Sequence, residues 1–173
     1  MICSPISLKN KIVADDMAIY SMNSCVKKAL DEYDFQANEK ERIIFRDQGN
    51  FSFKRSKHFV KHVLFNLLRN SLQHAGDHAV IQIWFGEGRS GSNQVHFKDN
   101  GVGISPDKLL HIFDSFRINH SSGTGIGLAF CRMVMDGMGG GIECRSALGQ
   151  IGWYTDIILT FPPVPIDYKE DIN

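Results

Sequence analysis

Apolar residues recur at helical spacing over one long stretch in the middle of the chain. The residues at this spacing are Phe59, Val63, Leu64, Leu67, Leu68 and Leu72. Together with Ser56, whose hydroxyl suits the start of a helix, they predict a helix that runs to about Ala75. A shorter pattern of the same period, from Val26 to Tyr33, follows Asn23. It predicts an earlier helix with Asn23 as its cap.

Short runs of β-branched and aromatic residues predict strands between and after these helices. The runs cover residues 17–20, 41–46, 51–54, 79–85, 94–98, 142–145 and 153–161. The intervening sequence DQGN at 47–50 has the composition of a tight turn, so we expect 41–46 and 51–54 to form a hairpin. The glycine- and serine-rich segment 86–93 is expected to be a loop that joins the next two strands.

Proline and glycine mark the ends of two further helices. Pro106 is expected to begin a short helix through Phe113, since proline is favoured in the first turn. Another helix is expected from about Thr124 to Met138, ending at the glycines 139–141, where left-handed backbone costs little. Hairpins with helices set between them favour an α+β fold. We therefore predict a two-layer sandwich with helices on one face of a mixed, mainly antiparallel sheet.

The bulk composition narrows the classes of partner. A chain of 173 residues suits one domain, which we place at 17–163, between a lead-in at 1–16 and a tail at 164–173. Its 19 basic and 19 acidic residues balance, so no nucleic-acid partner is expected. No apolar run approaches the length of a membrane span, and the four cysteines show no paired short spacing. A cytoplasmic, monomeric isolated domain with free thiols is expected.

Two amides stand out on the long predicted helix. Asn66 and Asn70 lie one turn apart, and Gln73 continues the same polar stripe. A solvated face explains such a stripe, but asparagine is a poor helix former, which favours a role for the amides. A carboxamide oxygen can bind Mg²⁺, a hard cation that prefers oxygen ligands and leans on substrate phosphates.

Two glycine-rich segments carry further candidates. The sequence DNGVGI at 99–104 follows a predicted strand, and its aspartate is either part of an ordinary turn or an acceptor for an exocyclic amine such as that of adenine. The sequence GTGIGL at 123–128 opens a predicted helix, where free backbone amides favour an anion. It is not a Walker loop, because no lysine follows the glycines, and it does not follow a strand as a Rossmann fingerprint does.

About twenty residues separate the two glycine-rich segments. They include Phe113 and Phe116. A loop of this length that is anchored by aromatic residues suits a lid over a bound nucleotide. Packing in the core is the commoner role of phenylalanine and stays open here.

The order of these segments resembles the Bergerat ATP-binding fold shared by histidine kinases, gyrase-type topoisomerases, a class of heat-shock chaperones and MutL repair proteins. FNLLRNSLQHA at 65–75 resembles the N box of histidine kinases, and KDNGVGI at 98–104 resembles the first glycine box. IFDSF at 112–116 resembles the F box, and SGTGIGLAFCRMVMDGMGG at 122–140 resembles the second glycine box. The resemblance covers roughly residues 17–163.

The resemblance implies a role for each matched residue. Asn70 would bind Mg²⁺ with the help of Asn66, and Asp99 would hold the adenine amino group of ATP. Gly101 and Gly103 would shape the pocket. Arg117, on the lid, would meet the γ-phosphate and complete a catalytic set with the two asparagines. The other nucleotide contacts that it implies are Gln73, which stands where the N box commonly has lysine, and Ile104, Phe113, Phe116, Ser122, Gly123, Thr124, Gly125, Ile126, Gly127, Leu128 and Thr155.

Position 66 separates the branches of this superfamily. The branches that hydrolyse ATP resemble one another in having a glutamate there as general base. An amide cannot accept that proton, so Asn66 favours transfer to another molecule. In histidine kinases the acceptor is a histidine in a pattern like H-[ED]-x-[RK]-x-P, which none of the seven histidines here matches.

We therefore expect the ATP-binding catalytic domain of a two-component sensor histidine kinase. Its expected partners are a dimerisation and histidine-phosphotransfer domain of the same protein and a downstream receiver domain or response regulator. The parent protein is either soluble or anchored in the bacterial inner membrane. A serine kinase of the anti-sigma-factor type and a nucleotide-binding pseudokinase remain alternatives.

Overall fold

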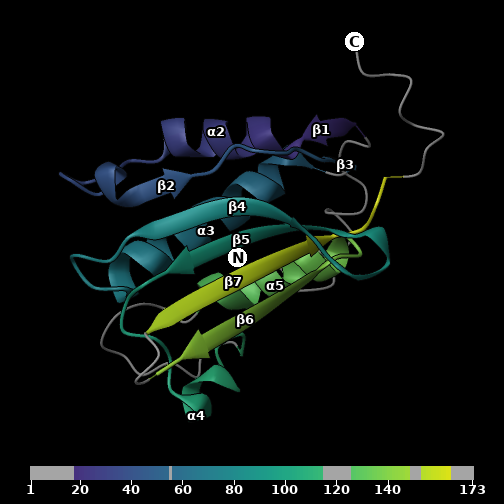
Figure 1. Cartoon of the computed structure of the whole chain (residues 1–173). Coiled ribbons are helices and arrows are strands. Elements are labelled where there is room, and N and C mark those ends of the chain that lie inside the picture. Colours follow the sequence, from purple (N-terminus) through teal and green to yellow (C-terminus); the bar gives the residue numbers. More distant parts are fainter. Residues whose placement is uncertain (1–17, 55, 115–125, 149–152, 165–173) are drawn as a thin grey trace, which may run out of the picture.

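A five-stranded sheet is the central element of the fold in the computed structural model of the chain (Figure 1). The structure describes residues 18–54, 56–114, 126–148 and 153–164. The strands lie in the order β2, β4, β5, β7 and β6, with β2 parallel to β4 and the other three pairings antiparallel. Their bounds are Ile43–Phe45 for β2, Ile81–Glu87 for β4, Asn93–Asp99 for β5, Gly141–Ala147 for β6 and Tyr154–Phe161 for β7. The predicted mixed, mainly antiparallel sheet is confirmed.

A second, two-stranded sheet corrects one prediction. β1 (Ile19–Ser21) pairs antiparallel with β3 (Ser52–Lys54), whereas β2 belongs to the larger sheet. The hairpin predicted between 41–46 and 51–54 is therefore wrong. The turn residues serve another purpose, because Oδ1 of Asn50 accepts the backbone N–H of Asn23 at 2.9 Å. This hydrogen bond ties the 47–50 segment to the first turn of the helix that begins at Met22.

The first helix, α2 (Met22–Glu32), begins earlier than predicted. Its cap is Ser21, whose Oγ accepts the backbone N–H of Ser24 at 3.2 Å. Asn23 lies inside the helix, where its Nδ2 donates to the backbone oxygen of Asp47. The predicted cap at Asn23 is wrong, because that amide is used in a tertiary contact.

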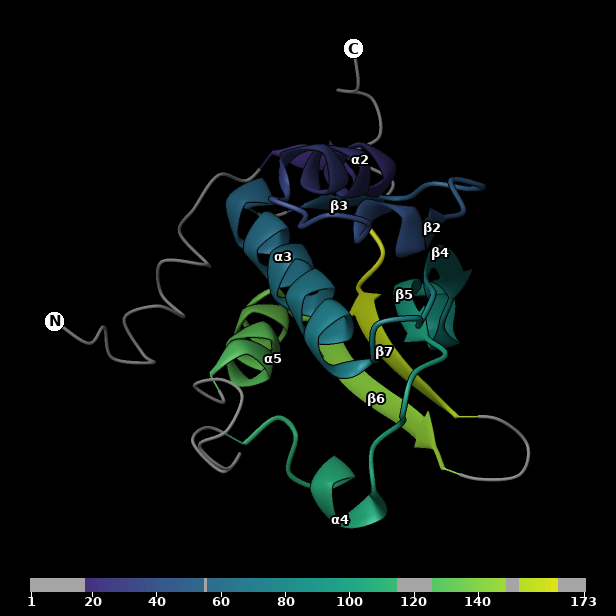
Figure 2. The same cartoon turned by 90° about the vertical axis from the view of Figure 1, so that its left-hand side faces the viewer.

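Two helices cover one face of the large sheet (Figure 2). α3 (Lys57–His74) agrees closely with the prediction, and α5 (Gly127–Gly137) lies beside it. α5 starts three residues later than predicted, with Ile126 at its cap position.

Short helices lie in three of the connections between the described elements. α4 (Pro106–Leu109) is shorter than predicted, because hydrogen-bonded turns at His111 and Asp114 replace its expected last part. The other two are single 3₁₀ turns, η1 (Lys40–Arg42) and η2 (Arg89–Gly91).

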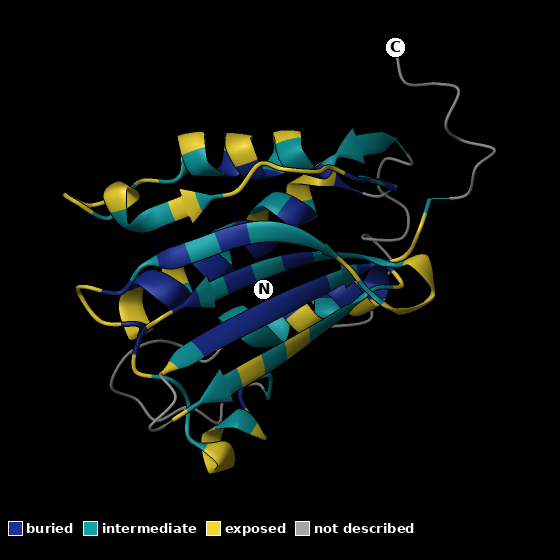
Figure 3. Ribbon diagram, viewed as in Figure 1, coloured by how far each residue is buried: buried dark blue, intermediate teal, exposed yellow. Residues whose placement is uncertain are grey.

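The core lies between the large sheet and its helices. β7 is buried along most of its length (Figure 3). Alternate residues of β5 point toward the helices, and Val95 and Phe97 are almost fully buried there. The α3 residues that join them in the core are Val60, Val63, Leu64, Leu67, Leu68 and Leu72. The sheet therefore holds α3 rigidly, with its polar stripe turned away from this core.

Other predictions concern the helix end, the thiols and the membrane. Gly139 has a φ of 72°, which confirms left-handed backbone after α5. Cys25, Cys131 and Cys144 are free thiols, as predicted; Cys3 lies outside the described residues. Within the described ranges, each helix is too short or too polar to cross a bilayer.

Candidate nucleotide-binding site

The two asparagines of α3 lie at partly buried positions. The Nδ2 atom of Asn70 is buried and has no hydrogen-bond partner among the described residues. A buried polar group without a partner costs about 1–3 kcal/mol, so the fold keeps Asn70 at an energetic disadvantage. An unpaired polar atom of this kind indicates that the hydrogen-bond partner of Asn70 is a bound ligand.

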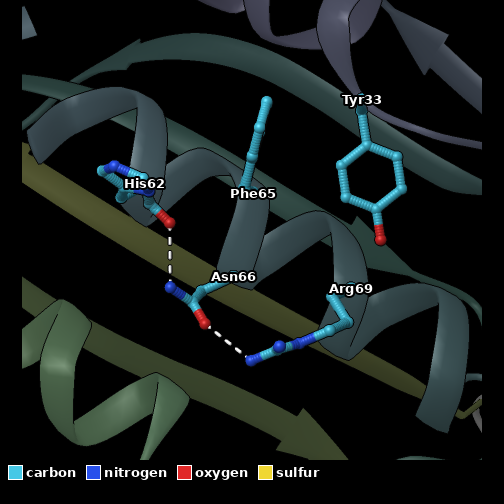
Figure 4. Close-up of a pocket in the computed structure, with 5 residues that line it drawn as sticks. All are labelled: Tyr33, His62, Phe65, Asn66 and Arg69. Atoms are coloured by element: carbon cyan, nitrogen blue, oxygen red, sulfur yellow. Dashed lines mark hydrogen bonds between the residues drawn. The ribbon is translucent and has the colours of Figure 1, made fainter. Parts of the chain in front are cut away.

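Asn66 has partners on both ends of its amide (Figure 4). Its Nδ2 donates to the backbone oxygen of His62 at 2.9 Å, and its Oδ1 accepts from Nη2 of Arg69 at 2.8 Å. A recess of about 270 Å³ opens here, lined by Tyr33, His62, Phe65, Asn66 and Arg69. The two hydrogen bonds fix the orientation of the carboxamide.

The start of α5 lies against this amide. A Cβ added to Gly127 would lie 2.9 Å from Oδ1 of Asn66 and 3.3 Å from Nη2 of Arg69. A larger residue would push these groups apart, so glycine allows the close approach. Free backbone amides at a helix start favour an anion, and here they lie next to Asn66.

Asp99 ends β5 and points into the helix layer. Its side chain is 5% exposed, and its Oδ1 accepts the backbone N–H of Gly101 at 3.0 Å. Burial raises the pKa of Asp99 to about 6, although hydrogen bonds from the backbones of Gly101 and Thr155 oppose the shift. Thr155, a predicted site residue, lies directly opposite Asp99 on β7. The carboxyl group is therefore held in place in a largely dry setting.

The loop after Asp99 is fixed by close packing. A Cβ on Gly101 would overlap the backbone of Ala75 at the end of α3. Gly103 has a φ of 68°, and a Cβ there would meet the backbone oxygen of Ala147. Both glycines are thus required for the shape of this loop, as predicted for a segment where backbone approaches closely.

Ser146 is a residue that the sequence interpretation missed. Its Oγ accepts the backbone N–H of Ile104 at 2.8 Å and donates to the backbone oxygen of Tyr154 at 2.7 Å. It joins the loop after β5 to strands β6 and β7. The available signal was weak, because a serine at an inward-facing strand position is common.

α3 connects the two halves of the site. Asn66 lies beside the start of α5, and Ala75 lies under Gly101. Nine residues of helix separate them, which is about 14 Å along the axis. Asn66 and the loop that follows Asp99 therefore meet α3 at points about 14 Å apart, a separation that suits an extended nucleotide.

Other predicted residues lie at the edge of this arrangement or beyond it. Phe113 is half-buried beneath the guanidinium of Arg132, 4.9 Å from the ring centre, and Gln73 and Ile126 are exposed. Leu128 packs against the core. The predicted site residues that lie outside the described residues are Phe116, Arg117, Ser122, Gly123, Thr124 and Gly125.

A second recess, of about 410 Å³, lies behind the first glycine-rich loop. Its lining includes Gly101, Val102 and Trp153. Neither this recess nor the one beside Asn66 is lined by Asn70 or Asp99. The segment 115–125 is outside the described part of the chain.

Comparison with known proteins decides what this arrangement is. The profile of the histidine kinase-, DNA gyrase B-, and HSP90-like ATPase family matches residues 56–165, more than half of the chain. The chain belongs to this family. The match includes α3, both glycine-rich segments and the large sheet from β4 onward. Membership of this ATPase family implies ATP binding.

Curated relatives agree with the family. The CAI-1 autoinducer sensor kinase/phosphatase CqsS of Vibrio cholerae is 31% identical over 167 residues, which cover 95% of this chain and 24% of that protein. The autoinducer 1 sensor kinase/phosphatase LuxN of Vibrio campbellii is 35% identical over 162 residues, covering 91% of this chain and 18% of that protein. The chain thus spans about a quarter or less of these relatives.

Solved structures support the same fold. The mycobacterial sensor histidine kinase MprB aligns with a TM-score of 0.67 at 18% identity, covering 86% of this chain and 99% of that one. The catalytic domain of the histidine kinase ThkA also aligns with a TM-score of 0.67, at 21% identity, covering 84% of this chain and 94% of that one. The ATP-binding fold predicted from the boxes is confirmed.

Proposed function

We propose that the chain binds Mg-ATP between α3, the loop after β5 and the start of α5, and presents the γ-phosphoryl group to a histidine on another domain. The observation that carries this proposal is the position of α3. Asn66 on its polar stripe meets the start of α5, and Ala75 at its C-terminal end meets the loop that follows Asp99. A nucleotide laid along this stripe has a carboxyl group at one end and helix-start amides at the other.

The adenine end of the proposed site belongs to Asp99. A carboxylate accepts hydrogen bonds, and the exocyclic amine of adenine donates them. Gly101 and Gly103 bring the loop backbone close to α3 and β6, and Ile104 is tied down by Ser146. Thr155 lies opposite Asp99 and completes this wall.

The phosphate end belongs to the asparagines and α5. Mg²⁺ prefers oxygen ligands and keeps waters and substrate phosphates around it, so carboxamides suffice as its protein contacts. The buried Nδ2 of Asn70, unpaired among the described residues, is a donor that a phosphate oxygen would satisfy, and Oδ1 of the same amide would bind the metal. We assign Asn70 as the principal Mg²⁺ ligand and Asn66 as the second, and Mg²⁺ would offset the phosphate charge during transfer.

The remaining predicted contacts complete the proposal. Gly127 and Leu128 begin α5, where backbone amides face the proposed phosphates, and Ile126 precedes them. Phe113 flanks the lid segment, and Gln73 extends the stripe. The other proposed contacts, on the lid and the glycine-rich segment, are Phe116, Arg117, Ser122, Gly123, Thr124 and Gly125.

The identity of residue 66 favours transfer over hydrolysis. An amide cannot take a proton from water, so Asn66 supplies no general base. The γ-phosphoryl group would therefore be transferred to a stronger nucleophile than water. Both relatives bear the name sensor kinase/phosphatase and are far longer than this chain, which supports an acceptor on another domain.

This role implies further domains and partners in the parent protein. We propose an ATP-binding unit at 17–163 that works with a dimerisation and histidine-phosphotransfer domain of the same protein and signals to a receiver domain or response regulator. The N-terminal part of this unit belongs to it because α2 and β3 pack against the same core as α3. A cytoplasmic position is proposed for the unit, with the parent protein soluble or anchored in the bacterial inner membrane.

Phosphoryl transfer tests the proposal directly. The chain joined to the rest of its parent protein is incubated with γ-labelled ATP and Mg²⁺, with Asn70→Ala as the comparison. The expected product is a phosphoprotein whose label is lost in acid and kept in base, as for phosphohistidine, and which Asn70→Ala does not form. An acid-stable label would instead support a serine kinase.

A further inference from the structure

Arg69 is a charged residue within the 65–75 segment of α3, beside the polar stripe, and the predicted site did not include it. It lies between Asn66 and Asn70 in sequence, and its Nη2 donates to Oδ1 of Asn66 at 2.8 Å. The same nitrogen would lie 3.3 Å from a Cβ on Gly127. The guanidinium is therefore located where α3 meets the first turn of α5.

The positive charge of Arg69 has no acidic partner in the described part of the chain. The lining of its recess contains the phenol of Tyr33 and the imidazole of His62 but no carboxylate (Figure 4). Lys61 on the same helix differs, because its Nζ lies 2.9 Å from Glu32. An unbalanced guanidinium beside a helix start makes a favourable place for an anion.

Arg69 and a metal ion would compete for one atom. Oδ1 of Asn66 is the oxygen that a cation would bind, and Nδ2 of that amide already donates to His62. Two positive charges in contact with one carboxamide oxygen repel each other. A metal ion at Asn66 would thus release the guanidinium from this hydrogen bond, a short distance from the metal-bound phosphates.

The position of Arg69 along α3 determines which phosphate its guanidinium would contact. Asp99 and Gly101 lie near Ala75, about 14 Å away along the helix from Asn66. A nucleotide whose base is at Asp99 has its terminal phosphate at the Asn66 end. Arg69 therefore lies at the end of the site that distinguishes a triphosphate from a diphosphate.

We infer that Arg69 binds the γ-phosphate, exchanging its hydrogen bond to Asn66 for the phosphate when the metal-nucleotide complex binds. It thereby makes the site prefer ATP to ADP. This inference rests on the proposed function, because it assumes a nucleotide between Asp99 and α5. It adds a second cation to the lid residue Arg117, which stays unchanged in every variant below.

Binding measurements separate this role from a structural one. Calorimetric dissociation constants are measured in Mg²⁺ for ADP and for AMPPNP, an ATP analogue that resists hydrolysis, with wild type, Arg69→Gln and Arg69→Lys. Loss of a charge-assisted contact to the γ-phosphate is expected to weaken AMPPNP binding about tenfold in Arg69→Gln and ADP binding less than about twofold. Arg69→Lys keeps the charge and should lie close to wild type.

Two further variants act as controls. Lys61→Gln removes a cation from the same helix on the side facing Glu32, and it should leave the ratio of the two constants unchanged. Gln73→Lys in the Arg69→Gln background returns a positive charge one turn along the same stripe, and it should restore part of the AMPPNP affinity. Thermal unfolding of each variant confirms that it is folded.

The outcomes are distinct. Equal weakening of ADP and AMPPNP in Arg69→Gln, or no weakening of either, overturns the role assigned to Arg69 while leaving the nucleotide site intact. Binding of neither nucleotide by folded wild type overturns the proposed function itself, and this inference with it. An equal change in the ratio for Lys61→Gln would show a general charge effect and also overturn the inference.

Discussion

The backbone N–H of Ile104 donates to Oγ of Ser146, 2.8 Å away, and this serine donates in turn to the backbone oxygen of Tyr154. One hydroxyl thus joins the loop after β5 to the edge of the sheet. The loop carries Gly101 and Gly103 and follows Asp99 directly. Its position in the proposed site therefore depends on a residue far away in sequence.

Ser146→Ala tests this link. The change leaves the N–H of Ile104 without its partner, and we expect the free energy of unfolding to fall by about 1–2 kcal/mol. Nucleotide affinity should fall several-fold, because the loop loses its anchor. Urea denaturation and calorimetry measure the two effects. Ser24→Ala, on the exposed face of α2, is the control and should change neither.

Gly101→Ala tests the close approach of the loop to α3. A Cβ there overlaps the backbone of Ala75, so we expect a loss of about 1–3 kcal/mol in the free energy of unfolding, as in other overpacked sites. Gly141→Ala is the matched control, since a Cβ at that glycine meets nothing within 4 Å. Equal stability of the two variants would contradict the packing described here.

Asn70→Leu separates function from stability. The replacement keeps a similar volume and removes a buried Nδ2 that has no partner among the described residues, so the free energy of unfolding should stay constant or rise by up to about 1 kcal/mol. Nucleotide binding in Mg²⁺ should be lost. Leu67→Ala, on the core side of the same helix, is the reference and should lose about 2–5 kcal/mol. A large loss of stability in Asn70→Leu would contradict a ligand-facing role.

The pKa of Asp99 predicts a pH dependence of stability. Because burial raises this pKa from 3.8 to about 6, the folded chain binds the proton more tightly than the unfolded chain does. The contribution of Asp99 to stability is therefore present at low pH and declines as pH rises from about 4 to about 6. Asp99→Asn should lack this component, which denaturation curves across that range would reveal. A stability difference between the two proteins that stays constant over this range would contradict the buried carboxyl group.

The elements built from local patterns were predicted well. The periodicity of leucines in α3 and the alternation in β4 and β5 reflect burial against one surface, and such burial leaves a trace in sequence. The hairpin between β2 and β3 failed for the opposite reason. Turn composition at 47–50 is local, whereas the parallel partner of β2 is β4, which lies far along the chain.

The site residues that belong to a local sequence motif could be predicted. Asp99 and Gly101 were found because a strand followed by glycine-rich turn residues leaves a local pattern. The contact of Gly127 with Asn66 joins two helices that are far apart in sequence, and nothing local indicates it. Ser146 was missed for the same reason, since its two partners belong to other strands and loops.

Binding of AMPPNP in the presence and absence of Mg²⁺, by wild type and Asp99→Ala, tests the central claim most directly. Removing a buried carboxyl group should leave the chain folded, and Asp136→Ala on the exposed side of α5 is the surface control. We expect Mg²⁺-dependent binding by wild type and by the control, and at least about tenfold weaker binding by Asp99→Ala, the effect of one lost charge-assisted hydrogen bond. Equal binding by Asp99→Ala and wild type would contradict the placement of the nucleotide.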